Sequence, residues 1–363
     1  MATKNQIDGN LKGETGTGQY VGDNTPTLIT PVIGAATGTS LNLGSSTTMT
    51  GMIDDDSFAT ASSSLAASSE SIKAYVDSMS GGVAPNNRSD GRLTLTTGTP
   101  VTTSDVTAAT TLYYTPYIGN GISLYDGSTA WDMVTFSELS IAVPASTSQM
   151  YDVFCYNNSG TATLELTAWT NDTTRATALT YQDGVYVKTG ATTRKYLGSF
   201  RTTAVSGETE DSAANRLVWN YYNRVRREML VTESTNSWTY STATMRQANA
   251  NTANQLGIVL GIAEDSIEVM VLVRSNTSGA TTRATATGIG IDSTSTTSSS
   301  MTRFDQQNTG SLNVGKPISF YTGYQLGYHY FVWLEYGAGA DTQTWYSNSS
   351  ISYLSGIKAT ILG

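Results

Sequence analysis

The chain has 363 residues, of which 13% are charged and 39% are hydrophobic, and its formal net charge is −9. This length allows one large all-β domain or two to three smaller domains. A nucleic-acid partner needs a basic surface that neutralises phosphates, so the acidic balance argues against one. The basic cluster Arg224, Arg226 and Arg227 lies close to Glu228, and we interpret it as a solvated strand face.

Cysteine and histidine are too scarce for the usual metal and redox sites. Cys155 is the one cysteine, which excludes an intrachain disulfide, and His329 is the one histidine. Together they exclude Cys/His zinc sites and thiol redox pairs. The sequence shows no N-terminal apolar leader and no apolar run of about 18 residues. We therefore expect neither an obvious export signal nor a membrane span, and we expect no cofactor.

Residues 1–50 form a distinct zone with few bulky side chains and almost no charge after Asp23. Pro26 and Pro31 disfavour a helix, and closely spaced Gly and Thr favour extended chain with tight turns. Such a segment buries too little surface to fold alone, so we expect it to need a partner.

One short helix is predicted after the Ser/Ala-rich run. We expect that run to be a flexible segment that leads into the helix. Ser68 or Ser69 is a suitable N-cap, and Glu70 falls in the first turn, where the helix dipole favours negative charge. Gly81 and Gly82 are expected to end the helix.

The predicted helix carries one apolar stripe at spacings of three and four residues, made of Ile72, Tyr75, Val76 and Met79. About ten residues make a marginal helix in water unless it packs against something. A small parallel bundle of identical helices suits so narrow a stripe. The alternative is a single helix that lies on the following β domain. Residues 83–90 are expected to be a linker, so that residues 51–90 form a linker and neck.

From residue 91 onward the sequence alternates between short β-type runs and turn signals. Asp126-Gly127 and Asn157 to Gly160 are expected to be hairpin turns. Turn signals at intervals of roughly 8 to 12 residues are typical of an antiparallel β-sandwich or jelly roll. We expect a β-rich head over 91–363, as one domain or as two subdomains, 91–230 and 231–363, with the last strand built into a sheet.

The acidic clusters do not have the spacing of a metal site. Asp54 to Asp56 lack the glycine and glutamate of a calcium loop, so we interpret them as a solvated linker or as charges that lead into the helix. The same interpretation applies to Glu264, Asp265 and Glu268, which flank a predicted turn.

Evidence for catalysis is weak. No Gly-x-Ser-x-Gly elbow accompanies His329, which we interpret as a histidine packed in an aromatic strand. Paired carboxylates for glycoside cleavage remain open, and the candidates near Tyr and Trp are Asp126, Asp132, Glu138 and Asp152. We expect no enzymatic function.

The N-terminal zone resembles a module of tailed-bacteriophage fibre proteins with the pattern GTG-x-(F/Y)-VG-x-x-(S/T)-PTL-x-TP-x-(L/I)-G. The matching residues are Gly16, Gly18, Tyr20, Val21, Gly22, Pro26, Thr27, Leu28, Thr30, Pro31 and Gly34. Later segments, including "LYYTPYIGNGISLYDGSTAW" and "EDSAANRLVWNYYNRVRREM", are similar to a region shared among phage tail-associated proteins. The resemblance spans roughly residues 13 to 230. A single N-terminal module with no long repeat shaft after it implies a short appendage.

The resemblance implies a homotrimeric virion protein, made in the host cytoplasm and placed on the outside of the phage particle. Residues 1–50 would attach to other virion proteins of the tail, collar or capsid, with Tyr20, Val21, Pro26, Leu28 and Pro31 as attachment residues. The β-rich head would then contact the host surface. Alternatives are a capsid head fibre or decoration protein and a glycan-cleaving tailspike, and the absence of long β-helix repeats disfavours the tailspike.

Aromatic residues beside turn signals are candidates for contact with a host-surface glycan. These are Tyr117, Tyr125, Trp131, Trp169 and Trp345. Packing in the core is the alternative for each.

Overall fold

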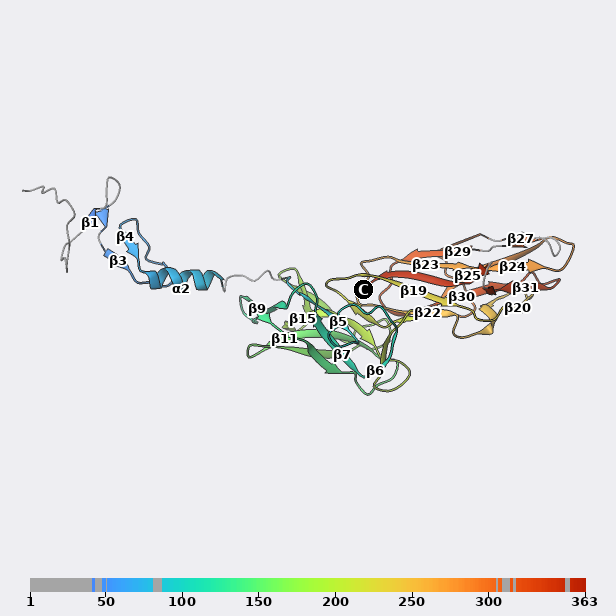
Figure 1. Cartoon of the computed structure of the whole chain (residues 1–363), viewed down its shortest axis with the longest axis horizontal. Helices are drawn as coiled ribbons and strands as arrows, with labels where there is room; N and C mark the ends of the chain where they lie inside the picture. The colour runs from blue at the N-terminus through green and yellow to red at the C-terminus, as the bar shows by residue number, and fades with distance from the viewer. Residues whose placement is uncertain are drawn as a thin grey trace, which may run out of the picture. The chain divides into compact units, whose positions relative to one another are not determined.

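The computed structural model describes residues 41–42, 48–49, 51–80, 87–304, 306–308, 314–315, 318–349 and 353–363. The expected attachment residues Tyr20, Val21, Pro26, Leu28 and Pro31 lie outside these ranges. Within the described ranges strands predominate and α2 is the one α-helix, so the expected mainly β fold is confirmed (Figure 1). In the same ranges no helix has the length and apolar character needed to cross a membrane.

The chain divides into two compact units between Ser78 and Met79. The first unit contains the strands β1 (Leu41–Asn42), β2 (Thr48–Met49), β3 (Gly51–Ile53) and β4 (Leu65–Ala67). It also contains most of the helix α2 (Ser69–Ser80), which extends two residues beyond the unit. β3 and β4 pair in parallel, and Ile53 at the end of β3 is buried. The Ser/Ala-rich run is therefore not simply a flexible approach, because part of it forms β4.

Ser68 is the N-cap of α2. Its hydroxyl accepts a hydrogen bond from the backbone N–H of Ser71 at 3.0 Å, and its carbonyl accepts from the N–H of Ile72. The carboxylate of Asp54 accepts hydrogen bonds from the hydroxyls of Ser68 and Ser71. Asp54 thus places negative charge at the positive end of the helix dipole, as one of the two sequence interpretations expected.

The apolar stripe of α2 faces solvent within its own unit. Ile72, Tyr75 and Val76 are 49%, 38% and 53% exposed. The ring of Phe58 meets the ring of Tyr75 edge-on, with 4.9 Å between the ring centroids. The side chain of Met79, the fourth residue of the stripe, lies outside the described part of the chain.

The second unit begins with strands that build the first half of the head. They are β5 (Gly91–Thr94), β6 (Val106–Ala109), β7 (Thr111–Pro116), β8 (Gly121–Tyr125), β9 (Trp131–Thr135), β10 (Leu139–Ala142), β11 (Met150–Asn158), β12 (Thr161–Ala168), β13 (Leu179–Gln182), β14 (Val185–Lys188), β15 (Ala191–Arg201), β16 (Thr209–Asp211), β17 (Asn215–Arg216) and β18 (Val218–Asn220). The hairpins expected at Asp126-Gly127 and at Asn157 to Gly160 are confirmed as β8–β9 and β11–β12.

The remaining strands build the second half of the head. They are β19 (Arg226–Thr232), β20 (Ser237–Thr239), β21 (Met245–Gln247), β22 (Gln255–Leu260), β23 (Ile267–Leu272), β24 (Arg274–Thr277), β25 (Arg283–Ile291), β26 (Met301–Phe304), β27 (Gln306–Asn308), β28 (Val314–Gly315), β29 (Ile318–Gly323), β30 (Gly327–Tyr336), β31 (Gln343–Tyr346), β32 (Asn348–Ser349), β33 (Tyr353–Leu354) and β34 (Gly356–Leu362). A short 3-10 helix, η1 (Ala248–Ala250), follows β21.

The end of the predicted linker belongs to the head. Ser89 and Asp90 are buried, and Ser89 bridges to Ile122 at the start of the β8–β9 hairpin. Asp90 accepts hydrogen bonds from the guanidinium of Arg88 and from the backbone N–H of Gly121. The prediction of a linker over 83–90 is wrong for these last residues, because they are buried and their backbone or side chain bonds to the β8–β9 hairpin of the head.

Strands β11 and β15 form a layer that is buried on both faces. Val153 of β11 and Leu197 of β15 contribute to one apolar core, with β5, β7 and β8. Phe154 and Tyr196, their neighbours in sequence, point to the opposite side and join a second core, which continues into the second half of the head. Alternation along a strand thus supplies two cores from one sheet.

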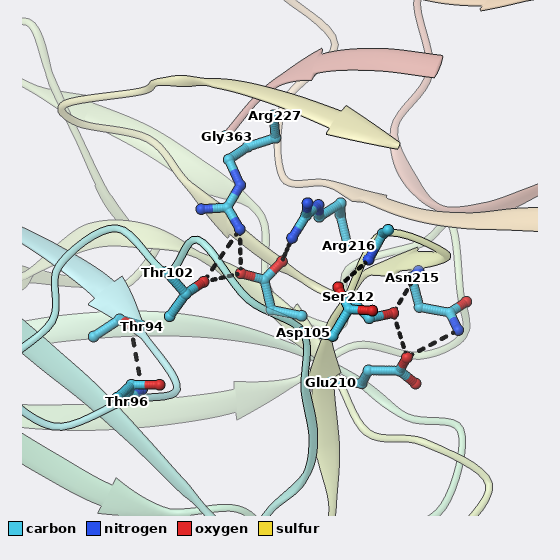
Figure 2. Close-up of polar contacts among 12 residues, drawn as sticks. Thr94, Thr96, Thr102, Asp105, Glu210, Ser212, Asn215, Arg216, Arg227 and Gly363 are labelled. Carbon is cyan, nitrogen blue, oxygen red and sulfur yellow. Dashed lines mark hydrogen bonds and ion pairs between the residues drawn. The ribbon is translucent and has the colours of Figure 1, made fainter. Parts of the chain in front are cut away.

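The two halves of the head share one sheet. β17 pairs in parallel with β22, which joins β16 and β6 to β30 and β25. Beside the β17–β22 pair, Asp211 accepts hydrogen bonds from Arg227 at 2.7 Å and from Arg216 at 3.0 Å. Figure 2 shows the guanidinium groups of Arg227 and Arg216 bonded to one carboxylate between them. A second sheet, in the order β19-β34-β23-β29-β26, holds the last strand between two others, as expected.

The basic cluster Arg224, Arg226 and Arg227 is not a single solvated face. Arg226 is exposed, whereas Arg227 points to the other side of β19 and is buried against Asp211. Arg224 pairs with Glu264 and Asp265. The expectation failed for Arg227 because successive residues of a strand face opposite sides, and Asp211 compensates its charge.

Lys195 on β15 is a fully buried cation whose Nζ donates hydrogen bonds to the carbonyls of Arg88 and Ser123. Burial lowers the pKa of Lys195 to about 7. Between pH 7 and pH 10 the unfolded chain binds a proton here that the folded chain does not, so the contribution of Lys195 to stability should rise with pH across this window. We predict that Lys195→Met removes this rise, measured as urea midpoints at pH 7, 8, 9 and 10. An unchanged pH dependence in the variant would contradict the assignment.

Candidate functional site

An open groove of about 400 Å³ lies where loops of both halves of the head meet. We call it the tyrosine groove, and it is lined by Thr173, Thr174, Arg175, Ala178, Leu179, Tyr186, Ile262, Ala263 and Leu326. A second cavity beside the shared sheet, next to Arg92 and Asp211, has a volume of about 10 Å³. That is room for about one water molecule, so the tyrosine groove is the candidate site.

One wall of the groove includes Tyr186 of the β13–β14 hairpin, and Tyr181, which is not part of the lining, stacks on Tyr186. Tyr181 and Tyr186 are paired across the two strands, and their ring centroids are 4.3 Å apart. Asp183 and Gly184 between the strands both have positive φ, which is typical of a tight hairpin turn. Tyr186 also meets Tyr221 edge-on at 5.3 Å. The stack runs outward from the core, and Tyr181 at its end is 59% exposed.

Arg175 forms the floor of the groove and ties the two halves together. Its Nε donates to the carboxylate of Asp152 on β11 at 2.7 Å, and its Nη2 donates to the carbonyl of Gly261 beyond β22. The guanidinium lies 4.3 Å from the ring centre of Trp169. Arg175 therefore bonds to both halves at once, which positions the groove lining on either side.

The floor is a buried ion pair supported by hydroxyl groups. Asp152 is 1% exposed and also accepts a hydrogen bond from Ser199 at 2.7 Å. Burial raises the pKa of the Asp152 carboxyl, and the adjacent guanidinium of Arg175 acts in the opposite direction. Burial also raises the pKa of Tyr196, so its hydroxyl stays neutral beside this pair.

Four of the five predicted glycan-contact residues are core residues instead. Tyr125, Trp131, Trp169 and Trp345 are 8%, 7%, 3% and 0% exposed. The indole N–H of Trp131 donates to Asp183, and that of Trp345 donates to the carbonyl of Tyr240. A buried ring cannot stack on a sugar, so the prediction of direct glycan contact does not fit these four residues. The alternative, packing in the core, describes them. Tyr117 is 43% exposed but does not line the groove.

Three of the four carboxylates predicted as candidates for glycoside cleavage are hydrogen-bonded to other groups. Asp126 accepts hydrogen bonds inside its own turn, which lower its pKa to about 2, and Asp132 is exposed on β9. Glu138 accepts from Thr97 and Thr115, and Asp152 is buried against Arg175. Each of these three carboxylates has different hydrogen-bond partners.

The remaining sequence candidates also have structural partners. His329 places Nδ1 2.7 Å from a carboxylate oxygen of Asp292 and Nε2 3.2 Å from the carbonyl of Leu326, so it is hydrogen-bonded rather than packed only among aromatic rings. Asp55 accepts from Ser57 and Thr60 within its own turn. Across the part of the chain that the structure describes, no three His, Cys, Asp or Glu side chains are grouped to hold a metal ion.

No protein-family model matches this chain, and no curated protein matches it. Among solved structures it is similar to a Bacillus thuringiensis Cry1Da tryptic core variant, with 7% identity and a TM-score of 0.18. The match covers 70% of this chain and 48% of the other, so this chain spans about half the length of that protein. A likeness this low carries no argument about fold or function.

Breaking the buried Asp152–Arg175 pair should lower the unfolding free energy strongly. Removing one partner leaves an uncompensated buried charge, so Asp152→Asn and Arg175→Met should each cost about 3–5 kcal/mol of unfolding free energy. The double variant should lose less than the sum of the two single losses. The measurement is urea unfolding of all three variants.

Arg226→Met is the matched control, because the Arg226–Glu228 pair is exposed. Surface pairs contribute about 0–1 kcal/mol, so this change should be nearly neutral. Single losses at Asp152 and Arg175 as small as in the control would show that the pair does not hold the halves together.

Proposed function

We propose that this chain is a bacteriophage virion structural protein, a short trimeric fibre on the outside of the particle. Its N-terminal segment would bind other virion proteins, and its β-rich head would contact the host surface. The main support for this proposal is the order of the segments along the chain. A fibre-like motif at Gly16 to Gly34 is followed by the capped helix α2 with an exposed apolar stripe, and then by a β-sandwich head with an open aromatic groove.

The stripe on α2 supports the homotrimer. A helix of 12 residues is marginal on its own, and Ile72 and Val76 are about half exposed in the single chain. Packing three copies along these stripes would bury both residues and leave the polar face in water.

An outer sheet face of the head gives independent support for contact between copies. Met270 and Leu272 on β23 lie opposite Phe320 and Ile318 on β29, and all four side chains are 38–41% exposed. The outer face of an antiparallel sheet is normally polar, and a contiguous apolar patch marks an interaction surface.

The proposal assigns no catalysis to the chain. Asp126, Glu138 and Asp152, three of the four carboxylates that could have formed a glycosidase pair, are hydrogen-bonded to other groups, as described above. Contact with the host would then be passive, and many copies on one particle would raise weak individual affinities through avidity.

Ile72→Asp together with Val76→Asp should weaken the trimer. Each substitution would place a carboxylate in the proposed helix interface, where like charges repel and burial is costly. Sedimentation velocity should show a shift from trimer toward monomer. Lys73→Asp, which adds the same charge beside the stripe, should have a smaller effect. A trimer unchanged in the double variant, or monomers in the unaltered protein, would contradict this assignment.

Purified chain should bind host cells and slow phage adsorption to them. A fibre that contacts the host competes with the particle for the same surface, so adsorption should slow as the concentration of added chain rises. The measurement is the adsorption rate constant with and without the chain, with heat-denatured chain as the control. Unchanged adsorption, together with labelling of the chain on the capsid, would favour the capsid fibre or decoration protein instead.

A further inference from the structure

The tyrosine groove has the properties of a binding site for an uncharged ligand with both apolar and hydroxyl surfaces. Tyr186, Leu179, Ile262 and Leu326 give it apolar walls, and Arg175 is the one charged residue among its lining. The charge of Arg175 is already compensated by Asp152 at 2.7 Å. A carboxylate or phosphate ligand would therefore find no uncompensated cation in the lining.

The ion pairs around the groove are also balanced. Lys188 and Arg194 share Glu165, and Arg201 pairs with Asp172, which precedes Thr173 of the lining. Arg224 is held by two carboxylates, those of Glu264 and Asp265, just after Ala263 of the lining. With the Arg175–Asp152 pair, these contacts comprise five cations and five carboxylates, so their formal charges sum to zero. A further carboxylate, that of Asp292, is bound to His329, which also contacts the carbonyl of Leu326 in the lining.

Two polar groups in the lining have hydrogen-bonding capacity to spare. In the described part of the chain Arg175 uses Nε and Nη2, while its Nη1 has no hydrogen-bond partner. The exposed Thr174 uses its carbonyl within the loop, and its hydroxyl has no partner among the described residues. A donor and a hydroxyl placed near an aromatic wall can bind ligand hydroxyls while the rings contact C–H surfaces.

We propose that the tyrosine groove binds a neutral saccharide unit, with the pyranose on Tyr186 of the lining and extending over Tyr181, which stacks on Tyr186 beside the groove, and with hydroxyls on Arg175 Nη1 and Thr174. This deepens the proposed function, on which it rests, by naming the ligand class and the site. One face of Tyr181 stacks on Tyr186, and its 59% exposure leaves ring surface available to a ligand. The volume of about 400 Å³ accommodates one or two sugar units.

The test is saturation-transfer NMR and titration of the full chain with a panel of oligosaccharides. Neutral members would be built from glucose, galactose and N-acetylglucosamine, and anionic members would carry uronic or sialic acid. We expect at least one neutral oligosaccharide to bind, and anionic members of matched size to bind at least about fivefold more weakly. Tyr181→Ala and Tyr186→Ala should each weaken neutral binding about fivefold or more, whereas Tyr181→Phe should stay within about twofold.

Tyr117→Ala is the matched control, because Tyr117 is an exposed tyrosine that is not in the lining and contacts Arg92, whereas Tyr181 stacks on Tyr186 of the lining. It should leave saccharide binding unchanged. Because Tyr181 is largely exposed, its alanine variant is expected to fold, and unchanged circular dichroism would verify this.

The proposal is overturned if no neutral oligosaccharide binds, if anionic ones bind equally well, or if Tyr117→Ala weakens binding as much as Tyr181→Ala. These outcomes are separable from failure of the fibre function by measuring host-cell binding in parallel. Cell binding that survives Tyr181→Ala and is not inhibited by neutral sugars would overturn the groove while leaving the fibre function intact. Sugar binding by a chain that does not bind host cells would support the groove and contradict the adhesion role.

Discussion

The buried ion pair of Asp152 and Arg175 is the contact on which the head most depends. It combines a carboxylate from β11 with a guanidinium from the loop before β13, and the same guanidinium reaches the carbonyl of Gly261 in the other half. Burying two charges is costly unless they are paired and their other hydrogen bonds are made. Ser199 donates a hydrogen bond to Asp152 and Tyr196 accepts one from Arg175 Nη2, which meets most of that requirement and leaves Nη1 of Arg175 without a partner among the described residues. Because such a buried pair requires a specific geometry, it specifies one arrangement of the two halves better than apolar packing alone does.

The layer formed by β11 and β15 explains why a polar pair can be buried at this position. Residues on one side of the layer face the first core, and Phe154 and Tyr196 on the other side face the second. Asp152 therefore lies between two apolar regions, with little access to water. The shared sheet through β17 and β22 reinforces the junction, so that the groove lining from both halves is supported by hydrogen-bonded backbone. A groove built this way needs little rearrangement to bind a ligand, which lowers the entropic cost of binding.

Local patterns were sufficient to predict the β class and several of its turns. Asp126-Gly127 and Asn157 to Gly160 specify hairpins because those residues tolerate the backbone angles that tight turns need. The N-cap at Ser68 was likewise readable, since capping depends on three or four consecutive residues. The prediction of a linker failed at Ser89 and Asp90, because their partners Ile122 and Gly121 are more than 30 residues away in the sequence. Such contacts depend on tertiary structure.

The site was largely beyond what the sequence could predict. Proximity to turns suggested Trp131 and Trp345 as ligand contacts, but large aromatic side chains beside turns are equally suited to closing a core, and both are buried. Arg175 has no local signal, because Asp152 and Gly261 come from distant strands. The one signal that could have identified the groove is "TYQDGVY", where Asp183-Gly184 predicts a hairpin that pairs Tyr181 with Tyr186.

Electron cryomicroscopy of the phage particle tests the central claim most directly, because it gives location, symmetry and orientation together. The account predicts three copies around one axis, with residues 1–50 against the particle, the three α2 helices in contact, and the tyrosine groove facing outward. It would be contradicted by a single copy per site, by a chain inside the particle, or by a head packed flat against the shell with the groove covered.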